Sequence, residues 1–168
     1  MLKQSYLFNM YEKLQWCSDI ELGISNFFPM TLDMNLENRK YLFQVGIEFV
    51  YRAIKCGLLE SLIDLDFPSG ELNSLEHEFL IIANIELTSF ADNNEMSCQE
   101  RDIWTTEMLE GTDKLKSICQ DCCLIGYEEF DENDPRWEIF VQKIEKIFSE
   151  QNLPWNLEQP LFPVKYKR

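Results

Sequence analysis

The sequence is poor in positive charge and nearly lacks histidine. Its 168 residues include 15 Lys and Arg against 30 Asp and Glu, with one His and a formal net charge of −15. Contacts to phosphate need lysine and arginine, so this balance argues against direct binding to nucleic acid or to an anionic membrane surface. Any Ser-His-Asp or Cys-His hydrolase would have to use His77. Glu76 and Glu78 favour an exposed cation there, so we expect a surface histidine and no enzymatic activity.

Long apolar runs and a secretion signal are also lacking. The longest apolar stretches fall short of the roughly 18 residues that span a bilayer. They are interrupted by polar residues: Glu48, Arg52, Asn84 and Glu86. The stretch "MLKQSYLFNMYEKLQW" has no apolar core and no small-residue cleavage site of the signal-peptide kind. We therefore expect a cytoplasmic protein without membrane contact, in which the six cysteines are mostly buried free thiols.

The negative charge is concentrated in the middle of the chain. Residues 60–134 hold twenty acids and three bases and so carry −17, whereas the rest holds ten acids and twelve bases and carries +2. A field of one sign speeds association with a partner of the opposite sign and disfavours wrong pairings. The alternative is ordinary solubility, but solubility alone does not require one segment to hold the whole net charge. The segregation indicates a cationic protein partner.

The strongest helical pattern covers residues 37–59. Most positions there are apolar, and the polar side chains fall at steps of four, four and three in one narrow stripe: Gln44, Glu48, Arg52 and Lys55. A helix that is apolar around most of its circumference is buried on several sides. We therefore expect this helix to be central, with Gly57 ending it in the left-handed conformation.

Apolar periodicity also predicts helices over residues 5–17, about 75–91 and about 135–150. Asn73 or Ser74 can cap the second, with a buried strand in "FLIIANIEL" as the alternative, and Asp134 with Pro135 fits the start of the third. Four residues are expected on the inner face of the second helix: Leu80, Ala83, Leu87 and Phe90. Two short helices are expected in "RDIWTTEMLE" and "TDKLKSICQDCC", broken at Gly111.

The tail "LPWNLEQPLFPVKYKR" contains three prolines and cannot be helical throughout. We expect it to run extended across the surface, anchored by Trp155 and Phe162. The length fits a single acidic helical domain over residues 1–168. The fold class is therefore mainly α: an irregular helical bundle around the buried central helix, with room for minor short strands and an extended C-terminal tail.

Two stretches resemble metal sites. "CQDCC" (119–123) has the Cys-x-x-Cys spacing that chelates zinc, but a structural site needs four ligands, and Cys98 and His77 stand at no recognised spacing. On a helix the three cysteines continue the apolar face of Leu115 and Ile118, so a core role is expected. "DENDPRWEIF" begins like an EF-hand loop but lacks the glycine at position 6. We expect neither a metal nor a cofactor.

The acidic stretches also contain aromatic residues, a mixture that suits a surface for binding a cationic protein. Tyr127 and Phe130 interleave with the acids of "YEEFDENDPRWEIF", and Trp104 lies in "RDIWTTEMLE"; for Trp104 and Phe130 a core position is the alternative. The acids ahead of Asp134 exceed what one helix dipole uses. The candidate partner-binding residues are Glu100, Asp102, Glu107, Glu110, Asp113, Tyr127, Glu128, Glu129, Asp131 and Glu132.

The stretches "CQERDIWTTEMLEGTD" and "YEEFDENDPRWEIF", around a core such as "RKYLFQVGIEFVYRAIKCGLLESL", make a small acidic chain without catalytic motifs. In this character it resembles the bacterial immunity proteins of contact-dependent growth inhibition and other polymorphic toxin systems. The resemblance implies a cognate toxin domain as partner, often a nuclease with a basic cleft. An acidic face of this chain would cover that cleft. We expect the chain to be a monomer that forms a 1:1 complex. The alternatives are a nucleic-acid mimic that inhibits a host or phage enzyme, and a small hydrolase using His77 or the cysteines.

Overall fold

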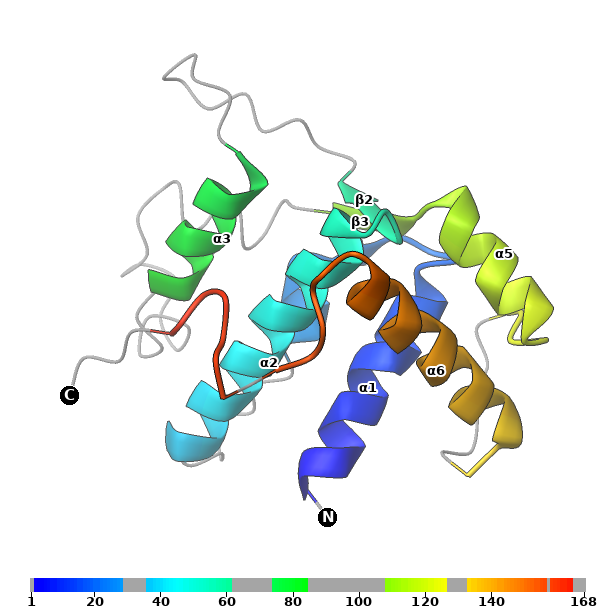
Figure 1. The fold of residues 1–168 in the computed structure, drawn as a ribbon, viewed down its shortest axis with the longest axis horizontal. Helices are drawn as coiled ribbons and strands as arrows, with labels where there is room; N and C mark the ends of the chain where they lie inside the picture. Colours follow the sequence, from blue (N-terminus) through cyan, green and yellow to red (C-terminus); the bar gives the residue numbers. More distant parts are fainter. Residues whose placement is uncertain are drawn as a thin grey trace.

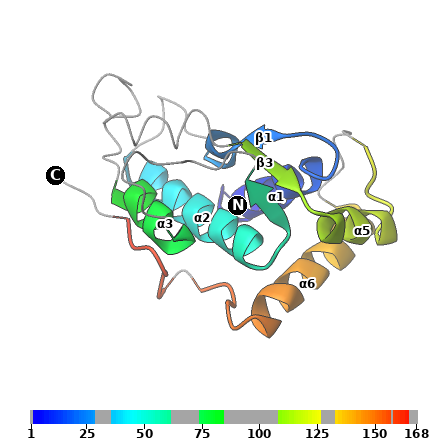
Figure 2. The ribbon, with the colours of Figure 1, turned by 90° about the horizontal axis from the view of Figure 1, so that it is seen from above.

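The computed structural model describes residues 2–28, 36–61, 74–84, 108–126, 133–156 and 158–164. In these ranges the fold is mainly helical with a small sheet, as predicted. Its elements are α1 (Leu2–Trp16), β1 (Leu22–Gly23), the 3₁₀ helix η1 (Ile24–Phe27), α2 (Leu36–Lys55), β2 (Leu59–Ser61), α3 (Leu75–Asn84), β3 (Met108–Gly111), α5 (Asp113–Asp121) and α6 (Pro135–Glu150). Figures 1 and 2 show α3 beside α2 at one end of the molecule, and α5 with α6 at the other.

The helix α2 is the centre of the core, as its sequence predicts. Phe49, which is fully buried, lies against four other segments. Its ring centroid is 5.1 Å from Tyr11 of α1, 6.4 Å from Phe27 of η1, and 6.1 Å from both Phe148 of α6 and Trp155 of the C-terminal tail. Edge-to-face and offset aromatic pairs at such distances add to the free energy gained by burying their apolar area. One side chain of α2 therefore links α1, η1, α6 and the C-terminal tail.

The end of α2 follows from one glycine. Gly57 has a φ of +67°, and the N–H of Leu58 donates to the carbonyl of Ala53 at 2.8 Å, while Gly57 N–H donates to Ile54 O at 2.9 Å. These two bonds form the Schellman motif that closes a helix with a left-handed residue. The predicted role of Gly57 is confirmed, and Leu59, the last residue of the predicted range 37–59, begins strand β2 instead of ending the helix.

A three-stranded antiparallel sheet has the order β1-β3-β2, with Leu22 opposite Leu109 and Glu60 opposite Glu110. This corrects the helix predicted in "RDIWTTEMLE", because residues 108–110 belong to β3; residues 101–107 lie outside the described ranges. Leu109 is buried between two half-buried neighbours, the period of two that strands show. Residues 108–111 form a strand because they pair with β1 and β2, which are distant in sequence. The local sequence pattern does not reveal this pairing.

The helix α3 starts where predicted, and it is a helix rather than a strand. Ser74 caps it, since the N–H of His77 donates to Ser74 Oγ at 3.3 Å. Leu80 was expected on the inner face and is instead 48% exposed; the buried residues are Phe79, Ile82 and Ala83. The reason is the seating of the Phe79 ring against Tyr51 of α2, which rotates Leu80 outward. Asn73, Leu87, Phe90 and the end of the predicted helix at 91 lie outside the described residues.

The helix α6 confirms its predicted start. Asp134 is the N-cap and accepts a hydrogen bond from the N–H of Arg136 at 2.9 Å, with Pro135 at the first position. Of the six apolar side chains expected on its inner face, four are buried and two, Val141 and Ile147, are half-buried against the core; the buried ones are Trp137, Phe140, Ile144 and Phe148.

The three cysteines in and just after α5 differ in their exposure to solvent. Cys119 and Cys122 are buried, as expected of a core role, but Cys123 is exposed. Cys123 follows the helix end and has a φ of 54°, and this left-handed conformation turns its side chain away from the inner face. Cys17 and Cys56 are also buried, and all five of these cysteines, the ones within the described ranges, carry free thiols.

Candidate functional site: an acidic groove

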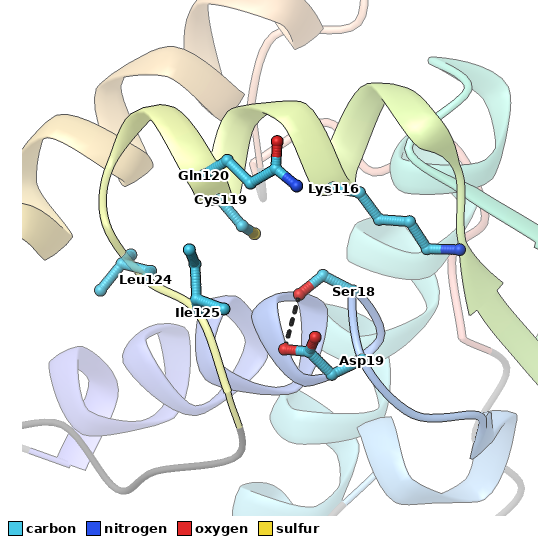
Figure 3. A pocket seen from close by; sticks show the side chains of 7 residues that line it. All are labelled: Ser18, Asp19, Lys116, Cys119, Gln120, Leu124 and Ile125. Carbon is cyan, nitrogen blue, oxygen red and sulfur yellow. Dashed lines mark hydrogen bonds between the residues drawn. The ribbon is translucent and has the colours of Figure 1, made fainter.

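A groove lies between the end of α1 and the helix α5 (Figure 3). It consists of two adjoining hollows, about 260 Å³ and about 410 Å³ in volume, that share Ser18, Asp19 and Lys116. We call it the acidic groove. Its lining residues are Ser18, Asp19, Ile20, Glu21, Glu110, Lys116, Cys119, Gln120, Leu124 and Ile125.

The groove forms because β3 is joined directly to the end of α1. The N–H of Gly111 donates to the carbonyl of Cys17 at 2.8 Å. A Cβ atom on Gly111 would lie 2.6 Å from that same carbonyl oxygen, so only glycine permits this approach. The contact places Glu110 beside the segment that follows α1, which contains Asp19 and Glu21.

Acidic side chains from two segments, the stretch after α1 and β3, converge here. The lining contains three carboxylates, Asp19, Glu21 and Glu110, and one cation, Lys116. The ammonium group of Lys116 donates to Glu110 Oε1 at 2.9 Å, and both side chains are about one-third exposed. This hydrogen bond raises the pKa of Lys116, and the nearby charges of Asp113 and Glu60 act in the same direction. Glu60 and Asp113, which we call the rim acids, therefore extend the negative field beyond the lining.

Five carboxylates elsewhere in the described residues are neutralised by bases. Ion pairs join them to nearby bases: Glu48 to Arg52, Glu76 to Lys55, Asp121 to Lys143, Asp134 to Arg136 and Glu150 to Lys146. Within the described ranges, by contrast, Glu21, Glu60 and Asp113 form no ion pair within 4.0 Å. Three acids without an ion pair therefore lie in or beside the groove.

The wall opposite the acids is apolar. Cys119 and Leu124 are buried, whereas Ile125 is 62% exposed at the mouth of the groove. Burial raises the pKa of the Cys119 thiol to about 12, and the same cause raises that of Cys17 to about 12. At neutral pH these thiols are protonated and poor nucleophiles. The groove therefore combines fixed carboxylates with an inert apolar wall.

Among the lining residues that the structure describes, one hydroxyl group has a carboxylate partner. Ser18 Oγ donates to Asp19 Oδ2 at 3.2 Å, the bond drawn in Figure 3, but no imidazole lies beside it. His77 is exposed on α3, which lies across α2 from α5 (Figure 1). Among the described residues, no three His, Cys, Asp or Glu side chains are placed to hold a metal ion. The carboxylates of the groove are groups that can bind a cation.

Two of the ten predicted partner-binding residues fall in the described ranges, and both are at the groove. Glu110 lines it and Asp113 is a rim acid. The other eight lie outside the described residues: Glu100, Asp102, Glu107, Tyr127, Glu128, Glu129, Asp131 and Glu132. The last residue before the 127–132 stretch, Gly126, donates its N–H to Asp19 Oδ2 at 3.0 Å. The chain therefore enters that acidic stretch from the edge of the groove.

Sequence reasoning missed Asp19, Glu21 and Glu60. Asp19 and Glu21 lie outside the acidic 60–134 segment, so the count of charges along the chain does not single them out. Glu60 lies at the edge of that segment, and its position opposite Glu110 depends on strand pairing. Only the sheet register brings these acids together, and the sequence contains no local signal for it.

No protein-family model, no curated protein and no solved structure matches the chain significantly. Within the described residues, no helix combines the length and apolar character needed to cross a membrane.

Proposed function

We propose that the chain is a non-enzymatic binding protein that holds a basic protein at the acidic groove. The observation that supports this proposal is the gathering of five acids around one lysine: Asp19, Glu21 and Glu110 in the lining, with the rim acids Glu60 and Asp113 beside them. Uncompensated fields of one sign attract and orient partners of the opposite sign. In sequence, further acids flank the groove residues: Glu100, Asp102, Glu107, Glu128, Glu129, Asp131 and Glu132.

The groove suits an arginine or lysine side chain of the partner. A guanidinium presents several N–H donors that match carboxylate oxygens, and its methylene stem packs on apolar surface. Asp19, Glu21 and Glu110 supply the carboxylates, and Leu124 with Ile125 supplies the apolar wall. In the unbound chain the ammonium group of Lys116 binds the Glu110 carboxylate. A cation of the partner would compete with Lys116 for that carboxylate.

The partner class that we propose is a cognate toxin domain with a basic cleft, such as a nuclease. A nuclease cleft binds phosphate through lysine and arginine, so carboxylates placed at the same positions would cover it and block the substrate. The chain would act as a monomer in a 1:1 complex in the bacterial cytoplasm. Neutralisation of a toxin by a bound acidic face requires no catalytic group from this chain.

The test compares three versions of the chain as baits. The groove variant reverses one lining acid and both rim acids, none of which forms an ion pair in the described structure: Glu21→Lys, Glu60→Lys and Asp113→Lys. The matched control makes an equal change in net charge at exposed acids outside the groove: Glu138→Lys, Glu150→Lys and Glu158→Lys. Glu138 lies in the first turn of α6 as Asp113 does in α5, so the loss of helix-dipole stabilisation is matched.

The expected result is a basic protein that the wild type and the control retain and the groove variant loses. That protein, expressed alone, should arrest growth, and coexpression of the wild type or the control, but not of the groove variant, should restore it. Equal retention and equal protection by the groove variant would contradict the proposal. A retained protein that is acidic or harmless to cells would contradict the toxin-neutralising role.

A further inference from the structure

The C-terminal tail crosses α2 without regular secondary structure (Figure 1, orange to red). We call residues 153–164 the strap. Asn152, with a φ of 59°, turns the chain out of α6. Arg52 then holds the start of the strap: its Nε donates to Leu153 O at 3.0 Å and its second guanidinium nitrogen to Pro154 O at 3.2 Å. The indole of Trp155 lies 5.4 Å from the guanidinium carbon, a cation–π distance.

A second attachment holds Phe162 and Val164. Gln44 Nε2 donates to Phe162 O at 2.9 Å, and Gln44 Oε1 accepts from the N–H of Val164 at 2.9 Å. One side-chain amide thus satisfies a carbonyl and the N–H two residues later, as a neighbouring strand would. The N–H of Phe162 donates to Glu48 Oε1 at 2.9 Å. These three bonds recognise the backbone, whatever the side chains.

An aromatic pocket supplies the selectivity. The Phe162 ring centroid lies 4.7 Å from that of Tyr51 on α2 and 5.8 Å from that of Phe79 on α3, and Phe162 is 5% exposed. We call Gln44, Glu48, Tyr51 and Phe79 the strap site. It has the parts of a peptide-binding site: donors and acceptors for an extended backbone, and a pocket for one aromatic side chain.

Glu48 of the strap site is held from within α2. Glu48 is fully buried, and Arg52 binds its other oxygen, Oε2, at 2.6 Å, which leaves Oε1 directed at the strap. Without a strap, that buried oxygen would lose the N–H of Phe162 and keep only the longer bond from Gln44 Nε2, at 3.3 Å, and the pocket between α2 and α3 would lose its ring. The site therefore favours an occupied state.

The two attachments are joined by more chain than the distance requires. Gln44 and Arg52 are eight residues apart on a helix, about 12 Å at 1.5 Å per residue. Residues 154–162 could span roughly twice that distance if fully extended. The slack forms an exposed turn in which Asn156 Oδ1 accepts from the N–H groups of Glu158 and Gln159 at 3.0 and 3.3 Å. The Phe162–Val164 segment is thus joined to α6 by a linker longer than the distance between its two attachments.

We propose that the strap site binds the Phe162–Val164 segment of a second copy of this chain, so that two chains exchange straps. The segment seated in the site defines the chemistry of the occupant, and every copy carries that segment. A short tether gives an effective concentration of about 1 mM, so the chain's own strap prevails in dilute solution. Exchange prevails when the chain's own pairing is broken or when the concentration approaches that value. The strap site is on α2 and α3, apart from the acidic groove, so exchange leaves the groove accessible.

Two complementary variants test strap exchange. In Gln44→Leu the site is impaired and the strap intact; in Phe162→Ala the site is intact and the strap impaired. Each variant alone should elute as a single chain of 20.0 kDa, whereas the mixture should form a species of twice that mass, detected by light scattering after gel filtration. The variant carrying both substitutions serves as the control. A mixture that remains at the single-chain mass at about 1 mM, the effective concentration of the tether, overturns the proposal.

A labelled peptide gives a second readout. A fluorescent peptide of residues 158–168 should bind Phe162→Ala at least tenfold more tightly than the wild type, whose site is occupied by its own strap. The same peptide with alanine in place of phenylalanine should not bind. Equal binding of both peptides, or equal affinity for both proteins, contradicts a strap site. Far-UV circular dichroism confirms that each protein is folded, and the wild type remains a valid target if a variant is not.

Discussion

The backbone N–H of Phe162 donates a hydrogen bond to Glu48 Oε1 at 2.9 Å, across 114 positions of sequence. The same carboxylate binds Arg52 through Oε2 at 2.6 Å, and Arg52 in turn holds Leu153 O. The polar stripe predicted on the central helix therefore has a purpose that its periodicity does not reveal. It is the surface on which the C-terminal tail lies, which explains how a helix apolar on its other faces carries a buried ion pair.

The first prediction concerns this ion pair. Glu48→Ala leaves the guanidinium of Arg52 buried without its carboxylate, and such a loss typically destabilises a protein by about 3–5 kcal/mol. Urea unfolding followed by circular dichroism measures the change. Lys146→Ala, which removes one member of an exposed pair, should cost less than about 1 kcal/mol. Similar free energies of unfolding for the two variants would contradict the structural role of Glu48.

The second prediction concerns Gly46. In an exposed helix, alanine in place of glycine stabilises by up to about 1 kcal/mol. At Gly46, however, an added Cβ would lie 2.6 Å from two carbons of the Phe28 ring and 2.9 Å from the carbonyl oxygen of Phe27. Gly46→Ala should therefore destabilise by about 1–3 kcal/mol, the usual cost of overpacking. Ser117→Ala, on the exposed face of α5, is the control and should not lower the midpoint of thermal unfolding. An unchanged midpoint for Gly46→Ala would show that η1 and α2 are not in contact.

The third prediction concerns acid stability. Lys55 and Tyr51 hydrogen-bond to Glu76, and the bond from Lys55 is the main reason that the pKa of Glu76 falls to about 2. A carboxyl group with a lowered pKa in the folded state stabilises the protein above its ordinary pKa. That contribution is lost as the pH falls from about 4.5 towards 2. Glu76→Gln should therefore unfold at a temperature that depends less on pH in this window. An unchanged pH profile would contradict the Lys55–Glu76 contact.

The fourth prediction concerns thiol reactivity. Cys123 is exposed, whereas Cys17 and Cys119 are buried with pKa values raised to about 12. A thiol reagent at neutral pH should label Cys123 in the native protein and label the other two only after denaturation, because the thiolate is the reactive form. Mass spectrometry of digested samples identifies the sites. Labelling of Cys119 as fast as that of Cys123 would mean that the apolar wall of the groove is open to solvent.

Much of the helical framework can be predicted from the sequence, because local rules suffice there. Asp134 and Pro135 specify the start of α6 by capping, and Gly57 specifies the end of α2 by its left-handed conformation. The small sheet could not be predicted in the same way. Its strands have two to four residues, and the partner that makes residues 108–111 a strand lies near residues 22 and 60.

Only part of the candidate site can be predicted from the sequence, because the rest depends on contacts between distant segments. Charge counting identifies the acidic middle segment and, within it, Glu110 and Asp113. It cannot identify Asp19 or Glu21, which reach the groove through the contact of Gly111 with Cys17. Similarly, Leu80 fits a helical face by spacing, but which face is buried depends on where the Phe79 ring packs.

The most direct test of the acidic groove measures the affinity of nona-arginine by isothermal titration calorimetry. The wild type and the control carrying Glu138→Lys, Glu150→Lys and Glu158→Lys should bind with similar affinity. The groove variant carrying Glu21→Lys, Glu60→Lys and Asp113→Lys should bind at least tenfold more weakly at the same net charge. Equal weakening in both triple variants would show that the total charge, and not the groove, attracts cations, and would contradict the account.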